Sequence, residues 1–184
     1  MRHSVATILR CTLLTAGAMA IVSCVAFPGT REYFEPNPED GTPTSFGVCG
    51  YHRADSLARE MPGLYVLASP QIVQGKGLGL VLFFSYQGGT IAVDASRIEL
   101  KVMPSGSTSK GRSVDTQVSS PYAGRPETLT TVTLGFGMDA DGAQSVEFVF
   151  RSGSVLRSGS AVELAPFRFT KVTKSDFYVN SINC

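Results

Sequence analysis

Short apolar runs separated by turn-forming residues fill the chain from Gly63 onward, and this pattern favours strands over helices. Hydrophobic and charged residues alternate strictly in residues 97–102, which directs every second side chain to one face of a strand. Residues 131–136 and 146–151 alternate in the same way. The runs are separated by Gly88-Gly89, Pro104-Ser105-Gly106, Asp139-Ala140-Asp141-Gly142, Ser152-Gly153 and Ser158-Gly159.

Seven to nine short strands at this spacing predict an all-β fold, a two-sheet antiparallel sandwich that is immunoglobulin-like. A closed barrel is the alternative. One short N-terminal helix is expected over residues 53–61, because Leu57 and Met61 are four apart and Pro62-Gly63 ends the segment.

Residues 78–84 differ from the other runs because they are apolar at almost every position. Such a strand is either covered on both faces or has an outer face that is an interface. In the second case Val81 and Phe83 form an exposed apolar patch.

A polar stretch over residues 103–127 provides a competing candidate for a binding site. Loops on rigid β-scaffolds often carry function, and Arg112, Tyr122 and Arg125 include residue types that are enriched at interface hot spots. A connection this long rarely lacks structure of its own, so we expect an edge strand or hairpin around the alternating Val114 and Val118.

The N-terminal residues have the pattern of an export signal. Arg2 and Arg10 precede an uncharged apolar run that is too short to span a bilayer. Residues 21–24, Ile-Val-Ser-Cys, resemble the lipobox of bacterial lipoproteins. That resemblance implies cleavage before Cys24 and acylation of Cys24. Cleavage after Ala26 or after Ala20 is the alternative.

Three segments follow from this interpretation: a signal peptide over residues 1–23, a tether over 24–45 and a β-sandwich domain over 46–184. Prolines, turn formers and acids without an apolar period suggest the tether. Val25 follows the cysteine, and by resemblance to enterobacterial lipoproteins this favours the outer membrane, with the domain facing the periplasm.

Cysteine parity then predicts a disulfide. If Cys11 leaves with the signal and Cys24 carries lipid, Cys49 and Cys184 are the remaining pair. Two thiols in an oxidising compartment are expected to join. Such a bond would close a long loop, which gives roughly 5 kcal/mol of stabilisation in the chain-entropy model.

Composition excludes several functional classes. Without Arg2 and Arg10 the chain has 14 basic and 15 acidic residues, so no nucleic acid partner is expected. His52 is the single histidine after the signal, which argues against a multi-histidine metal site and against an enzyme. We therefore expect no catalytic residue, metal or cofactor.

The sequence favours a lipid-anchored envelope protein that binds an envelope or secreted protein partner. An inhibitor or immunity lipoprotein that blocks a secreted or periplasmic hydrolase is a more specific version. An envelope hydrolase and a carbohydrate-binding module are the alternatives from other classes.

Overall fold

The computed structural model describes residues 26–45, 54–73, 77–119 and 126–179 of the 184-residue chain. In these residues strands dominate, and the helical elements are two 3₁₀ turns, Pro38–Asp40 and Ala95–Arg97. The same residues contain no helix with the length and hydrophobicity needed to cross a membrane. The all-β prediction is therefore confirmed for the described part of the chain.

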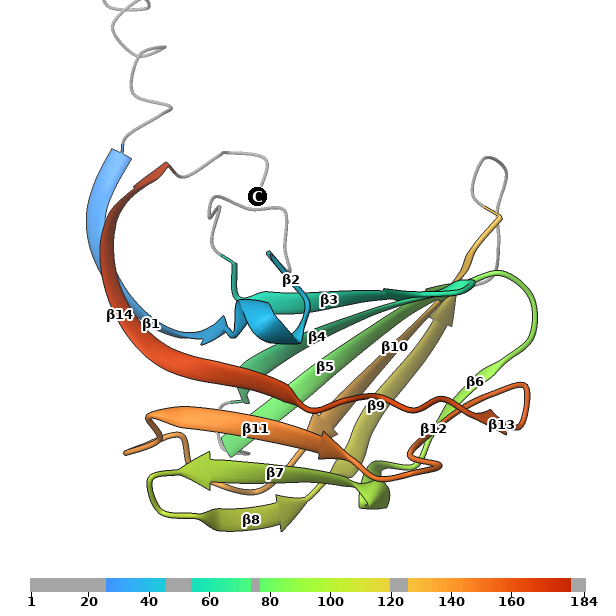
Figure 1. Cartoon of the computed structure of the whole chain (residues 1–184). Coiled ribbons are helices and arrows are strands. Elements are labelled where there is room, and N and C mark those ends of the chain that lie inside the picture. Colours follow the sequence, from blue (N-terminus) through green and yellow to red (C-terminus); the bar gives the residue numbers. More distant parts are fainter. Residues whose placement is uncertain (1–25, 46–53, 74–76, 120–125, 180–184) are drawn as a thin grey trace, which may run out of the picture. The chain divides into compact units, whose positions relative to one another are not determined.

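The strands form sheets of five, six and three strands, with the orders β1-β14-β11-β7-β8, β2-β3-β4-β5-β10-β9 and β13-β12-β6. Figure 1 shows β3, β4, β5, β10 and β9 fanning out in one layer, and β11, β7 and β8 in a second. In chain order the strands are β1 (Ala26–Pro36), β2 (Thr42–Thr44), β3 (Ser56–Met61), β4 (Leu64–Val73), β5 (Gly77–Tyr86), β6 (Ile91–Val93), β7 (Ile98–Met103), β8 (Ser107–Lys110), β9 (Arg112–Ser119), β10 (Thr128–Gly135), β11 (Ser145–Phe150), β12 (Val155–Arg157), β13 (Ser160–Ala161) and β14 (Phe167–Val179).

Contacts along the chain divide it into two compact units. The described residues of the smaller unit, 26–31 and 174–179, belong to β1 and β14, and the hydroxyls of Thr30 and Ser175 form a hydrogen bond of 2.8 Å there. The larger unit consists of Glu32–Phe46 and Arg53–Thr173. The core, the side-chain clusters and the hollows described below lie in the larger unit.

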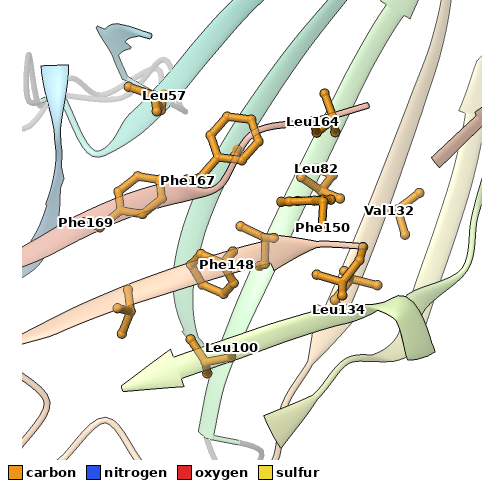
Figure 2. Close-up of a cluster of buried hydrophobic side chains, with 14 of the residues drawn as sticks. Leu57, Leu82, Leu100, Val132, Leu134, Phe148, Phe150, Leu164, Phe167 and Phe169 are labelled. Atoms are coloured by element: carbon orange, nitrogen blue, oxygen red, sulfur yellow. The ribbon is translucent and has the colours of Figure 1, made fainter. Parts of the chain in front are cut away.

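The hydrophobic core lies between the inner faces of the five-stranded and six-stranded sheets (Figure 2). Alternation works as expected: Ile98 and Leu100 of β7 are fully buried, and so are Phe148 of β11 and Phe167 of β14. The rings of Phe148 and Phe169 meet edge to face, with centroids 6.1 Å apart. The other face of each of these strands carries polar or charged residues, so each short strand pattern is explained by one buried face.

The prediction of a helix over residues 53–61 is wrong, because β3 occupies Ser56–Met61 and pairs antiparallel with β4. A two-residue connection, Pro62-Gly63, joins the two strands, and Gly63 has φ +68°, which favours glycine. The strand pattern was hidden because a charged residue, Arg59, takes an inward position opposite Val66. The four-residue spacing of Leu57 and Met61 fits a strand with period two equally well.

The predicted tether over residues 24–45 also needs correction in its described part. Strand β1 and the 3₁₀ turn lie within this segment, and β2 pairs with β3. Phe34 is 4 % exposed and belongs to the core. Pro36 ends β1, and Pro43 lies inside β2, an edge strand in which a residue without an N–H is tolerated, so these prolines do not keep the chain unpaired.

A cluster of two arginines and one aspartate holds this N-terminal segment to the rest of the larger unit. The Arg168 guanidinium donates to both carboxylate oxygens of Asp40, at 2.9 and 2.5 Å. Hydrogen bonds from Arg168 hold the pKa of the Asp40 carboxyl below its ordinary value, against the opposing effect of burial. Arg59 donates to the Asp40 backbone oxygen and lies over the Phe167 ring, 3.8 Å from its centroid.

One run of chain passes from the five-stranded sheet to the six-stranded sheet. Strand β8 pairs with β7, and β9 pairs with β10. Gly111 joins β8 and β9, is buried, and donates its N–H to the Ile98 oxygen at 2.8 Å. A Cβ at this position would lie 2.8 Å from the Ala95 oxygen, so the change of sheet requires glycine.

Candidate functional site

Of the residues predicted to bind through the polar stretch, Arg112 lies in the described part of the chain. It is exposed, begins β9 and faces Gly135 across the ladder to β10. Tyr122 and Arg125 lie outside the described residues. Cys24, Cys49, Cys184 and His52 lie outside them as well, so the lipidation and disulfide predictions stay predictions.

The expected edge strand in the polar stretch is confirmed as β9. This strand stands at the edge of the six-stranded sheet, and every one of its residues is exposed. Val114 is 46 % and Val118 is 61 % exposed, which is unusual for valine in a strand. The register to β10 shifts next to Asp115, so Val114 sits at a bulge.

The predicted exposed patch at Val81 and Phe83 is corrected. Val81 is 5 % exposed, and Phe83 is half-buried. Both face away from the core, on what we call the outer face of the six-stranded sheet. Strand β5 has neighbours on both sides, so residues such as Leu67, which lies opposite Phe83 and is 6 % exposed, shield one another on this face.

A hollow of about 390 Å³ lies at one end of the six-stranded sheet; we call it the glutamate hollow. It forms where the β3–β4 turn, the end of β5 and the start of β10 meet. Its acidic residues are Glu60 and Glu127. The complete lining is Glu60, Met61, Gly63, Leu64, Tyr65, Ser85, Tyr86, Gln87 and Glu127.

The ladders explain how separate strands bring these residues together. Glu60 lies opposite Tyr65, and Tyr65 lies opposite Ser85. Burial raises the pKa of the Tyr65 phenol above its ordinary value, and the neighbouring Glu60 carboxylate raises it further. Tyr86 is 3 % exposed, and its hydroxyl shares a 3.0 Å hydrogen bond with Thr130. Both tyrosines therefore line the hollow, and the hydroxyl of Tyr86 is fixed by its hydrogen bond to Thr130.

Arg157 holds the rim of the hollow in place. Its guanidinium donates to the Pro62 oxygen at 3.2 Å and to the Gln87 oxygen at 3.1 Å. These bonds join the β3–β4 turn to the segment that follows β5. A hydrogen-bonded arginine at this place indicates a preformed rim.

A second hollow, of about 450 Å³, is less informative chemically. It is lined by Glu35, Pro36, Asn37, Pro38, Pro43, Ala54, Thr170 and Val172. Glu35, the one acidic residue in this lining, already has an interaction within the chain. The glutamate hollow is therefore the stronger candidate for a ligand.

Sequence reasoning missed the glutamate hollow. Glu60 falls in the segment that was predicted to be a helix. Glu127 ends the polar stretch over residues 103–127, where no pattern distinguishes it from other acidic residues of the chain. The hairpin at Pro62-Gly63 is the signal that could have paired Glu60 with Tyr65. No family model, curated protein sequence or solved structure matches this chain.

Proposed function

We propose that this chain is a lipid-anchored protein of the bacterial envelope whose β-sandwich-like domain binds another envelope or secreted protein. In this proposal Cys24 carries the lipid, the domain faces the periplasm from the outer membrane, and a bond between Cys49 and Cys184 stabilises the fold. Disulfides form and persist in exported proteins, because the compartments that they reach are oxidising. The finer fold assignment that we propose is an immunoglobulin-like sandwich, a type that often serves as a binding scaffold.

The observation that carries the binding proposal is strand β9. It is an edge strand of eight residues, all exposed, with two exposed valines. Edge strands present backbone donors and acceptors to which an extended segment of a partner can pair. Arg112 lies at the start of this strand, so one residue of the polar stretch borders the proposed surface.

A pair of matched variants tests this proposal. Val118→Lys places a charge on the β9 edge, and Ile72→Lys does the same at an exposed apolar residue of β4, which is 57 % exposed. Both variants should keep the melting temperature, because both side chains face solvent. A stoichiometric partner that copurifies from detergent-solubilised envelopes should be lost with Val118→Lys and kept with Ile72→Lys.

Two results would contradict the proposal. One is that both variants retain the partner equally. The other is that no stoichiometric partner is found and the purified protein turns over envelope glycan, which would support the hydrolase class. If the partner is itself a hydrolase whose activity falls on binding, the inhibitor version of the proposal is supported.

Lipidation at Cys24 is tested separately. Two or more acyl chains anchor a protein stably, since each buried methylene contributes roughly 0.8 kcal/mol. Cys24→Ser should therefore move the protein from the membrane fraction to the soluble fraction. A wild type without acyl mass and a variant that stays membrane-bound would refute the anchor.

A further inference from the structure

The glutamate hollow carries two carboxylates that are not used within the fold. Among the described residues, neither Glu60 nor Glu127 has a hydrogen-bond or ion-pair partner. Glu60 lies in β3 and Glu127 directly precedes β10, and these two strands are separated by β4 and β5. At about 4.8 Å per strand the two backbones are roughly 14 Å apart, so the carboxylates border the hollow from opposite sides.

The space between the two glutamates is bordered by apolar groups and by one small residue. Ser85 lies opposite Tyr65 on one side and opposite Leu129 on the other, so a short side chain is flanked by two larger ones. Met61 and Leu64 add apolar surface to the lining. A hollow with apolar walls and carboxylates at its border fits a group with an aliphatic stem and a cationic end.

The balance of charge at the hollow is negative. Arg157 lies at the rim, close to the β3–β4 turn: a Cβ added to Gly63 would be 3.1 Å from the guanidinium of Arg157. That guanidinium donates to two backbone oxygens, which fixes it at the turn. Among the described residues of the lining and rim, two carboxylates therefore lie near one cation, and two of the five N–H donors of that cation are engaged. This leaves one negative charge in excess among those residues.

We propose that the glutamate hollow binds an arginine or lysine side chain of the protein partner, an assignment that rests on the proposed protein-binding function. The position of the hollow near the β9 edge supports a protein side chain rather than a free cation as its ligand. Ser119 of β9 lies opposite Leu129, which lies opposite Ser85. A partner segment paired to the free edge of β9 would therefore lie two strand spacings, about 10 Å, from β10, where Glu127 borders the hollow, and three spacings, about 14 Å, from Ser85.

The assignment is tested with short blocked peptides on the full chain in detergent micelles. The probes are acetyl-Ala-Arg-Ala-amide, the same peptide with neutral citrulline in place of arginine, and putrescine. Methyl resonances of Met61 and Leu64 report on the hollow, and Met103 on the other sheet is the internal control. The arginine peptide should shift the first two saturably, and the citrulline peptide should bind at least about tenfold more weakly.

Paired variants define the contribution of the carboxylates. Glu60→Gln with Glu127→Gln should weaken arginine-peptide binding at least about tenfold at an unchanged melting temperature. Asp141→Asn, which removes an exposed carboxylate from the turn before β11, is the matched control and should bind like the wild type. Equal binding of the citrulline peptide, an unaffected double variant or absent shifts would overturn the assignment.

Putrescine distinguishes a site for a protein side chain from a site for a free amine. Weaker binding of putrescine than of the arginine peptide supports the protein assignment, and equal or tighter binding overturns it. The results that would reject the proposed protein-binding function differ from those that would reject the role of the hollow. Arginine-peptide binding without any copurifying protein would reject the binding module, whereas a copurifying protein that is indifferent to the double variant would reject the role of the hollow.

Discussion

Arg59 offers the sharpest test of how the larger unit is held together. Its guanidinium donates to the backbone oxygens of Asp40, Ala165 and Pro166 at 2.5, 2.5 and 2.6 Å. It also lies over the Phe167 ring. Burial lowers the pKa of this guanidinium and the Asp40 carboxylate opposes that effect, but an arginine stays charged throughout the physiological range.

The cost of replacing Arg59 with methionine follows from these contacts. A hydrogen bond to a charged group contributes about 1.5–3 kcal/mol, and the contact with the ring about 0.5–2 kcal/mol. The bond to Ala165 is exposed and counts for little, and water can reach part of the oxygens that lose their donor. We therefore expect Arg59→Met to lower the free energy of unfolding by about 2–4 kcal/mol.

Equilibrium unfolding in urea measures this loss, with Arg151→Met as the control. Arg151 forms a surface ion pair of 2.7 Å with Glu99, and its side chain is 64 % exposed. Such pairs contribute at most about 1 kcal/mol. An Arg59→Met loss below about 1 kcal/mol, or one equal to that of the control, would refute the proposed stabilising role of Arg59.

Three further predictions address pH, the disulfide and the core. Hydrogen bonding to Arg168 lowers the pKa of Asp40, so this group stabilises the fold above its unfolded pKa of about 4. That stability should disappear as the pH falls through the folded pKa of Asp40. In a plot of melting temperature against pH, Asp40→Asn should therefore reduce the decrease over this pH range. Oxidised mature protein should contain no alkylatable thiol by intact mass if Cys49 and Cys184 are joined, and two alkylated cysteines without reduction would refute the bond. Phe148→Ala should cost about 3–5 kcal/mol in urea unfolding, because Phe148 is fully buried; a loss below about 1 kcal/mol would contradict its central place in the core.

Strands were predictable wherever alternation was clean. In β7 and β11 each inward residue is apolar and most outward residues are charged or polar, so a single period indicates both the strand and its buried face. Strand β3 lacked that pattern, because inward Arg59 is stabilised by backbone oxygens from distant segments. No local pattern contains those partners, so the segment resembled a helix.

The glutamate hollow could not be predicted from the sequence for a related reason. Glu60 and Glu127 are far apart along the chain and meet the same space only after three ladders are in register. A shift of one residue in any ladder would turn one carboxylate to the other face. Sequence patterns indicate strands well, but they do not determine which strands become neighbours.

Strand β5 illustrates why an apolar run does not by itself identify an interface. Leu82 and Phe84 are fully buried on the inner face, whereas Val81 is buried among its neighbours on the outer face. A polar substitution at Val81 or Phe83 would therefore change stability as well as any binding, because it places a polar group among shielded side chains. Glu60 and Glu127 lack this ambiguity, since neither has a partner among the described residues that a change to glutamine could disrupt. A loss of affinity in their double variant therefore reports on binding, and this is the reason to search for the partner through the carboxylates rather than through the apolar strand.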